Sequence, residues 1–454
     1  MLIRTVWIKN MFFGIEYKIV NDFLESKSYL FGVKYKTRKT DIAEIVADAQ
    51  KNFCIRENIL KERIRNGECV KVAFFISRTS MFPAKSLFKE MLKTTLFNPY
   101  IFILPDFRFG KKEAEANQKQ CEEDLSGYKN VFSIKNENDK KIEGFDIAVL
   151  PYPYDISYKK YDLYSLVRCG VLPICINYAY YCSAYDRDCL FASKRMGLFW
   201  KLFADNALNE AVAKKESVVH GTNVVLSGYC KMDSFKKIKK EPNSRKRIII
   251  APHHSVDGGY NDFMAMSNFD RYADLFLKLP EMYPQIDFVF RPHPALFLLL
   301  KNENFWGEKK VNNYIAAMKS NPNVVYSTEG DYFDEFAKSD GIIQDCGSFL
   351  AEYFYTKNPQ CYLLKQKDDV EKKFMAFGRE CLKNCYIAYN EKEILHFLDD
   401  VIVNGNDSMR KQREEFADQV VMLNYPKASA KIIDLLSQEL GGGNETVYSR
   451  SDGN

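Results

Sequence analysis

The sequence predicts an α/β protein made of two Rossmann-like domains with an N-terminal helical appendage. In both halves of the chain, short apolar runs of strand length alternate with helical patterns, which is typical of parallel βαβ units. A chain of 454 residues is also long for a single hydrophobic core, and a lysine- and arginine-rich stretch at 236–247 reads as a solvated linker between the halves. The expected divisions are an appendage at 1–66, a first domain at 67–236, a second domain at 237–441 and a disordered tail at 442–454.

The first part of the chain is aromatic-rich and then becomes helical, with apolar residues three and four positions apart before Gly67. After it, strands are expected at 70–77, 100–106, 131–134, 145–151 and 171–180. Helices are expected at 83–94, 111–124 and 199–215. Pro83 fits the first turn of its helix because the N–H that proline lacks has no helical partner there. This alternation predicts a parallel sheet with right-handed crossovers.

The alternation starts again after the linker. Strands are expected at 247–252, 286–290, 323–327, 341–344 and 359–365. Helices are expected at 271–279, 311–319, 331–340, 391–403, 409–423 and 427–440, with a further helix starting at about Ser348. The second half therefore predicts a parallel sheet of its own.

Composition excludes several classes of function. The net charge of +5, from 65 basic and 60 acidic residues, is too small to predict nucleic-acid binding, although it suits an anionic substrate or a membrane surface. No apolar run approaches the ~18 residues of a membrane span, and charges interrupt the N-terminus too often for a signal peptide. The twelve cysteines form no CxxC pair, and with five histidines no zinc motif is visible. We therefore expect no metal, no cofactor and a reducing, cytoplasmic location.

The stretch IDFVFRPHPA, from Ile286 to Ala295, is the strongest functional signal. Its prolines keep Arg291 and His293 out of a helix, just past the carboxyl end of a buried strand. Ligands of open parallel sheets bind at that end, and a guanidinium beside an imidazole suits phosphate. The alternative is a proline-stiffened loop with two solvated polar residues.

A second strand end of this kind is GIIQDCGS, from Gly341 to Ser348. Gly347 would let a ligand approach the backbone, and Ser348 would cap a helix whose N–H groups attract an anion. Asp345 is either a hydroxyl acceptor or a turn residue, and Glu352 either reaches a sugar hydroxyl or is solvated. The alternative is an ordinary strand-to-helix turn.

The third strand end carries His253 and His254. Strand alternation would turn only one of them toward the ligand crevice, unless the strand has already ended. If the three strands are neighbours, three of the five histidines face one crevice. His220 and His396 have no polar pattern around them, and we expect them to be non-functional.

With these residues assembled, the chain resembles the CDP-glycerol glycerophosphotransferase family of teichoic-acid polymerases and primases, over roughly 171–436. The segment VVLSGYCKMDSF is similar to the family pattern vtGyPrxD, with Gly228, Tyr229 and Asp233 in place. IIIAPHHS is similar to its yaPtwR strand end, and FVFRPHP to its R-x-H-P motif. The family's His-Gly-Thr-Pro-Leu-Lys motif is not found, and INYAYYCSAYD stands roughly in its place.

The last shared pattern is SDGIIQDCGSFLAEYFYTKNPQCYLL, which is similar to sDxlItDYSSvffDyxxxxkPixfy. Here Gln344, Asp345, Cys346, Gly347 and Ser348 stand on the Thr-Asp-Tyr-Ser-Ser positions, and Glu352 stands on the later aspartate. The resemblance implies a glycosyltransferase-B type fold, in which two Rossmann-like domains face a central cleft. It also implies donor-binding residues in the second domain: Arg291, Gln344, Asp345, Gly347, Ser348 and Glu352.

By this resemblance the enzyme transfers a glycerol-phosphate, or another polyol-phosphate, from a CDP-linked donor to a hydroxyl of a cell-surface glycopolymer and releases CMP. His293, His253 and His254 are the candidate catalytic residues. The alternatives are a nucleotide-sugar-dependent glycosyltransferase of capsule or surface polysaccharide synthesis, and a non-catalytic nucleotide-binding subunit. The resemblance implies a lipid-linked or polymeric glycan acceptor and peripheral contact with the inner face of the plasma membrane. The sequence leaves homo-oligomerisation open.

Overall fold

The structure, a computed structural model, describes residues 13–20, 23–30, 33–139, 142–236, 245–256, 265–328 and 330–442. Most of the predicted linker at 236–247 and of the predicted tail at 442–454 therefore lies outside the described residues. Within the described ranges, no helix is both long enough and apolar enough to cross a bilayer.

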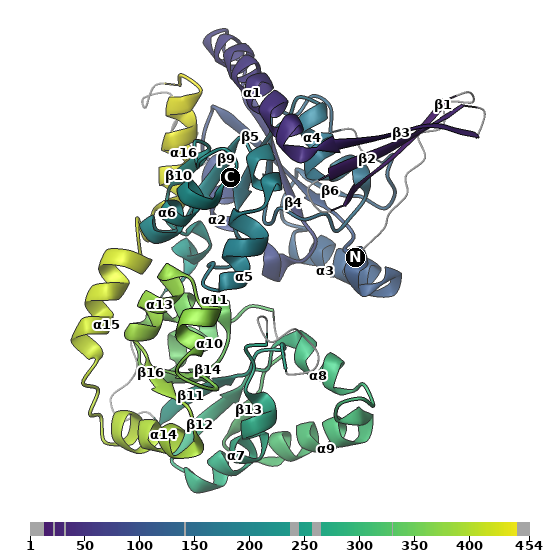
Figure 1. The fold of residues 1–454 in the computed structure, drawn as a ribbon. Coiled ribbons are helices and arrows are strands. Elements are labelled where there is room, and N and C mark those ends of the chain that lie inside the picture. The colour runs from purple at the N-terminus through teal and green to yellow at the C-terminus, as the bar shows by residue number, and fades with distance from the viewer. Residues whose placement is uncertain are drawn as a thin grey trace.

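Two parallel sheets with covering helices form the body of the protein (Figure 1). The first sheet contains β4 (Val70–Ile76), β5 (Phe97–Ile103), β6 (Val131–Ser133), β7 (Ile147–Leu150), β8 (Leu172–Ile176), β9 (Lys201–Ala204) and β10 (Val224–Leu226). Its helices are α2 (Lys85–Met91), α3 (Lys111–Asp124), α4 (Leu163–Arg168), α5 (Ala184–Asp186) and α6 (Ala207–Glu216). The inner strands β4, β7 and β8 are short apolar runs whose side chains are almost all buried, as sheets covered on both faces require, and the residues of the edge strands β6 and β10 are half-buried.

The second sheet contains β11 (Lys246–Ala251), β12 (Ile286–Phe290), β13 (Val324–Tyr326), β14 (Gly341–Gln344), β15 (Gln360–Leu363) and β16 (Tyr386–Ala388). Its helices are α7 (Phe269–Met282), α8 (Pro294–Leu300), α9 (Gly307–Ser320), α10 (Phe333–Lys338), α11 (Gly347–Glu352), α12 (Asp369–Lys373), α13 (Ala376–Lys383), α14 (Glu391–His396) and α15 (Arg410–Phe416). The prediction of two Rossmann-like domains is confirmed.

Each sheet has one topological switch point, where the chain changes its direction of travel across the sheet. The first sheet has the order β10-β9-β8-β7-β4-β5-β6, so its switch point lies between β4 and β7. The second has the order β13-β12-β11-β14-β15-β16, so its switch point lies between β11 and β14. In open parallel sheets the crevice outside the carboxyl ends of the strands at this point is where ligands bind.

The N-terminal segment differs from the expected helical appendage. Three antiparallel strands, β1 (Phe13–Val20), β2 (Phe23–Leu30) and β3 (Val33–Asp41), precede helix α1 (Ile42–Arg65). This small sheet extends away from the body in Figure 1. Helix α1 is part of the first domain, because Val46 and Phe53 on its inner face belong to the first hydrophobic core.

The prediction of a helix at 199–215 is also wrong for the first residues of that range. The chain forms β9 there, then breaks at Asn206, whose side chain accepts a hydrogen bond from the N–H of Asn209 and starts α6. A segment as short as KLFA does not reveal whether it is a strand or the first turn of a helix. Pairing with β8 and β10, which are distant in sequence, determines the outcome.

The C-terminal helix returns to the first domain. Helix α16 (Ala428–Glu439) packs Ile432, Ile433 and Leu436 into the first core, although its sequence position placed it in the second domain, 237–441. Figure 1 shows α15 beside the second domain and α16 beside the first. The N-terminus of α16 is held by Asp233, whose carboxylate accepts from the N–H groups of Ala428 at 3.1 Å and Ser429 at 2.7 Å.

Candidate functional site

The predicted site residues of three strands meet at the switch point of the second sheet. The N–H of His253, after β11, donates to Oδ1 of Asp345, after β14, at 2.6 Å. The N–H of His293, after β12, donates to the carbonyl oxygen of Pro252 at 3.0 Å. These backbone contacts fix the three loops relative to one another, and the convergence expected from the sequence is present.

Three imidazole rings form a cluster at this point. The ring centroids are 4.2 Å apart for His253 and His254, 4.1 Å for His254 and His293, and 5.3 Å for His253 and His293. Both His253 and His254 take part because β11 ends at Ala251, so strand alternation no longer separates them. All three rings are half-buried. One nitrogen of each lies within 4.8 Å of one nitrogen of each of the others, so the cluster could hold a metal ion.

The cluster is uncharged at neutral pH. Burial lowers the pKa of His254 to about 4 and that of His293 to about 3. Burial, together with the two neighbouring rings, also lowers the pKa of His253 well below its usual range. Nδ1 of His253 lies 2.7 Å from Oγ of Ser255, and Nδ1 of His293 accepts from the N–H of Ala295 at 3.1 Å. These contacts fix the orientation of two of the rings.

Arg291 follows β12, two residues before His293 in the sequence, and is only 9% exposed. Its Nη1 donates to Oγ of Ser327 and to Oε2 of Glu335, both at 2.8 Å, and its guanidinium lies 5.6 Å from the ring centre of Tyr332. The charge of Arg291 is therefore already balanced by Glu335. That Arg291 contacts phosphate remains a prediction.

Asp345 and Gln344, at the end of β14, are buried and hydrogen bonded to neighbouring loops and strands. Asp345 is fully buried and accepts hydrogen bonds from the N–H groups of His253 and Asn268, and burial raises its pKa to about 6. Gln344 is also buried, and its Nε2 donates to Oε1 of Gln360 at 2.8 Å. Both side chains are engaged in holding strands and loops together, and their direct contact with a donor remains a prediction.

The start of α11 differs from the expected serine cap. Extended geometry ends at Cys346, which is the N-cap residue, and the helix begins at Gly347. Ser348 therefore lies inside the first turn, and its predicted capping role is wrong. A Cβ atom added at Gly347 would have no atom within 4 Å, so the space next to this backbone is open to a ligand.

Glu352 has a different environment from the one expected. Its side chain is fully buried, with Oε1 accepting from Nζ of Lys231 at 3.0 Å and from the hydroxyl of Tyr229 at 3.1 Å. Its Oε2 accepts from the hydroxyl of Tyr332. Lys231 and Tyr229 belong to the first domain, so Glu352 joins the domains. This geometry does not favour the predicted contact with a sugar hydroxyl.

Three residues that shape the site gave no signal in the sequence. Glu335 lies in a charged helix of ordinary appearance, Lys231 lies in the first domain, and Ser255 resembles any polar loop residue. Glu335 and Lys231 form ion pairs with Arg291 and Glu352, which are distant in sequence. Ser255 contacts His253 because of the conformation of the loop after β11. The Tyr229 position was indicated only by the family resemblance.

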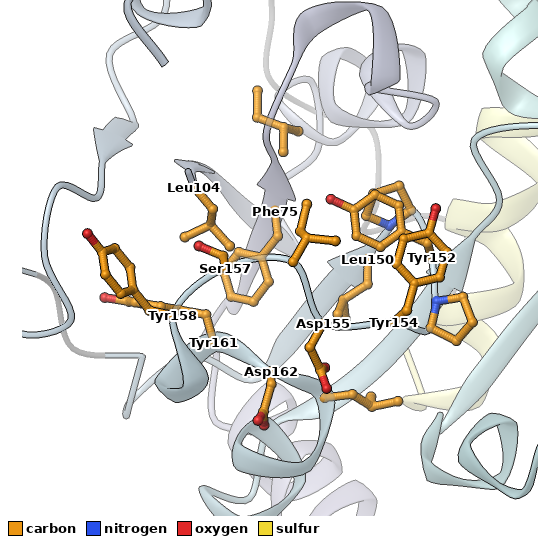
Figure 2. A pocket seen from close by; sticks show the side chains of 15 residues that line it. Phe75, Leu104, Leu150, Tyr152, Tyr154, Asp155, Ser157, Tyr158, Tyr161 and Asp162 are labelled. Carbon is orange, nitrogen blue, oxygen red and sulfur yellow. The ribbon is translucent and has the colours of Figure 1, made fainter. Parts of the chain in front are cut away.

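The switch point of the first sheet carries an aromatic group instead of histidines. Tyr152 and Tyr154, after β7, stack with ring centres 4.6 Å apart, and the guanidinium of Arg108 lies 5.2 Å from the ring centre of Tyr154. Figure 2 shows the adjoining cavity, which has a volume of about 30 Å³. That volume holds one or two water molecules, so the cavity itself is too small for a nucleotide or a sugar.

Comparisons with known proteins establish the fold. No protein-family model matches the chain, and no curated protein matches it in sequence. Among solved structures it is similar to S. aureus MnaA in complex with UDP, with a TM-score of 0.52, 13% identity, and coverage of 85% of this chain and 100% of the other. It is also similar to UDP-GlcNAc 2-epimerase from Neisseria meningitidis bound to UDP-GlcNAc, with a TM-score of 0.51, 14% identity, and coverage of 82% and 100%.

A third similar structure is a variant of the wall teichoic acid polymerase TagF, with a TM-score of 0.51, 14% identity, and coverage of 87% of this chain and 94% of the other. The chain therefore has the glycosyltransferase-B type fold that the resemblance implied. At these identities the likeness extends to the fold alone.

Proposed function

We propose that the protein is a transferase that moves a glycerol-phosphate or other polyol-phosphate from a CDP-linked donor to a hydroxyl of a cell-surface glycopolymer, with release of CMP. One observation carries the proposal: His253, His254 and His293 form a cluster at the ends of β11 and β12, and the N–H of His253 contacts Asp345, after β14, at the switch point of the second sheet. This position favours a ligand with a diphosphate, because open parallel sheets bind their ligands there.

The fold supports a nucleotide donor in general. MnaA, with the same fold, is seen in complex with UDP, and TagF is named as a wall teichoic acid polymerase. The motifs around Arg291 and Ser348 favour the CDP-polyol over other donors, because they resemble those of the glycerophosphotransferase family. A lipid-linked or polymeric glycan would be the acceptor, in peripheral contact with the membrane.

The reaction would proceed by attack of the acceptor oxygen on the β-phosphorus, with CMP as the leaving group. Such transfers depend mainly on positioning and on stabilising negative charge. The neutral ring of His293, His253 or His254 is the candidate to accept the hydroxyl proton, a contribution of ~10²–10⁴-fold in rate. Arg291, whose orientation Glu335 holds, would neutralise phosphate oxygens of the donor.

A second candidate is a glycosyltransferase that uses a nucleotide sugar. The structural similarity to proteins seen with UDP and UDP-GlcNAc favours this alternative. The two functions differ in the donor that they use and in the group that they transfer, so the donor decides between them.

The test is to incubate purified protein with CDP-glycerol, CDP-ribitol, CMP-sugars and UDP-sugars, with a glycan acceptor, and to measure the CMP, UMP or UDP released. We expect CMP from a CDP-polyol only. His293→Ala should abolish turnover without unfolding the protein, and His396→Ala, at an exposed position of α14, is the matched control. Release of UDP from a UDP-sugar alone would favour the glycosyltransferase. No nucleotide release with any donor, together with no thermal shift by cytidine nucleotides, would contradict both.

A further inference from the structure

Three imidazole side chains approach one another at the ends of β11 and β12 on a rigid support. Pro252, Pro292 and Pro294 restrict the backbone around them, and the hydrogen bond from the N–H of His293 to Pro252 links the two loops at 3.0 Å. The three rings lie within 4.1–5.3 Å of one another, centre to centre. The two loops therefore hold the three rings close together.

We propose that His253, His254 and His293 form a binding site for one divalent transition-metal ion of the Zn²⁺ class. Three imidazole nitrogens are a ligand set that Zn²⁺, Co²⁺, Ni²⁺ and Cu²⁺ accept and that Mg²⁺ and Ca²⁺ do not prefer. With metal–nitrogen bonds of about 2.1 Å, tetrahedral ligand atoms lie roughly 3.4 Å apart. The nitrogens here lie within 4.8 Å, so shifts of about an ångström in half-buried side chains would complete the site.

The surroundings of the rings suit coordination. An imidazole binds a metal through a ring nitrogen that carries no proton, and one nitrogen of each ring lies within 4.8 Å of one nitrogen of each of the others. His253 contacts Oγ of Ser255 through Nδ1, as metal-bound histidines contact an outer partner through their second nitrogen. His293 would give up its hydrogen bond from Ala295, exchanging one neutral hydrogen bond for a metal–nitrogen bond.

A metal ion at this site would supply positive charge that the neighbouring basic side chains do not. Arg291 is paired with Glu335 and Lys231 with Glu352, so both of these cations are already neutralised. A metal ion on three neutral rings would add positive charge where the donor diphosphate is expected, and three protein ligands leave a fourth position for a phosphate oxygen. This last step rests on the proposed function, whereas the metal site does not. The histidines would then act as ligands instead of proton carriers.

The test is calorimetric titration of the EDTA-treated, full-length protein with Zn²⁺, followed by Co²⁺ to record the visible absorption of a nitrogen-ligated ion. We expect one ion per chain. We also expect affinity at least 100-fold weaker in His254→Ala and in His293→Ala, and unchanged affinity in His396→Ala. Circular dichroism and a thermal melt without metal check that each variant is folded, and His254→Gln is the smaller change if the alanine variant is not. Absence of saturable binding, or equal binding by the double His254→Ala/His293→Ala variant, would overturn the proposal.

A parallel titration with CDP-glycerol, in EDTA and in Zn²⁺, separates this inference from the proposed function. Nucleotide binding without any zinc binding would contradict the proposed metal site and would support the proposed transferase function. Zinc binding without nucleotide binding under either condition would contradict the proposed transferase function and would support the proposed metal site. Nucleotide binding that strengthens with Zn²⁺ supports both.

Discussion

The Nζ atom of Lys231, in the first domain, lies 3.0 Å from Oε1 of Glu352, in the second. The lysine side chain is 15% exposed and the glutamate side chain is not exposed at all. Nζ of Lys231 also donates to the carbonyl oxygen of Tyr178 at 3.1 Å, and the hydroxyls of Tyr229 and Tyr332 complete the ring of donors around the carboxylate. This ion pair is therefore one of the contacts that join the two domains.

Replacing Lys231 with methionine should destabilise the protein strongly. The change leaves the carboxylate of Glu352 buried without its counter-charge, which typically costs about 3–5 kcal/mol. Equilibrium unfolding in urea, followed by tryptophan fluorescence, measures the loss. Lys357→Met is the control, because Lys357 pairs with Asp418 at the surface and should cost less than about 1 kcal/mol. Similar losses for the two variants would show that the interdomain pair does not stabilise the fold.

A substitution at Gly228 should disrupt the return of the chain to the first domain. Gly228 has a φ of +83°, and an added Cβ would lie 2.0 Å from the carbonyl oxygen of Leu423, in the segment that leads to α16. We expect Gly228→Ala to cost more than about 3 kcal/mol, since the backbone strain of 1–3 kcal/mol adds to a steric clash.

Gly405→Ala separates the two contributions. Gly405 has a similar φ of +76°, but an added Cβ there would meet no atom within 4 Å. Its cost should therefore be the backbone strain alone, about 1–2 kcal/mol. Thermal unfolding of both variants checks the difference, and equal melting temperatures would contradict the predicted clash with Leu423.

The strand ends of the second sheet could be predicted from the sequence because their signals are local. A short apolar run followed by prolines gives a strand and then a fixed loop, and both Arg291 and His293 lie where that pattern placed them. The convergence of the three strand ends was expected only if the strands were neighbours in one parallel sheet, and the observed order β12-β11-β14 meets that condition.

The other features depend on contacts that the sequence does not show. Glu335 neutralises Arg291 and Lys231 neutralises Glu352 across 44 and 121 positions of sequence, and no periodic pattern encodes such pairs. The apolar face of helix α16 packs into the first core, but the amphipathic pattern of the helix does not indicate which of the two domains that face will contact. Within the described part of the chain, the strands β1–β3 pair only with one another, in a region whose aromatic content gave no clear period.

The stability of the first domain should depend on the protonation of Asp205. This carboxylate is buried at the end of β9, where its Oδ1 accepts from Nδ2 of Asn206 at 2.7 Å and of Asn209 at 2.9 Å, and burial raises its pKa to about 7. In the unfolded chain the pKa is about 3.9. The folded protein therefore binds this proton more tightly, and stability falls as the pH rises from about 4 through about 7.

Asp205→Asn should remove this pH dependence. The difference in unfolding free energy between variant and wild type should shift in favour of the variant by about 1–3 kcal/mol between pH 5 and pH 8. Urea unfolding at the two pH values measures it. Asp334→Asn, at an exposed position of α10, is the control and should show no such shift. A constant difference for Asp205→Asn would mean that its carboxylate is ionised throughout this range.

The guanidinium of Arg291 should matter for its shape as well as for its charge. Arg291→Lys keeps a positive charge but cannot hold Ser327 and Glu335 in the planar geometry of the guanidinium while also facing a phosphate. If the crevice binds a diphosphate, we expect cytidine nucleotides to bind 10- to 100-fold more weakly, which corresponds to about 1.4–2.8 kcal/mol. Isothermal titration measures the affinity. Arg245→Lys removes a comparable guanidinium contact with Asp287, at a partly exposed site before β11, and should leave nucleotide affinity unchanged. Unchanged affinity in Arg291→Lys would place the diphosphate away from β12 and leave Arg291 a structural role with Glu335.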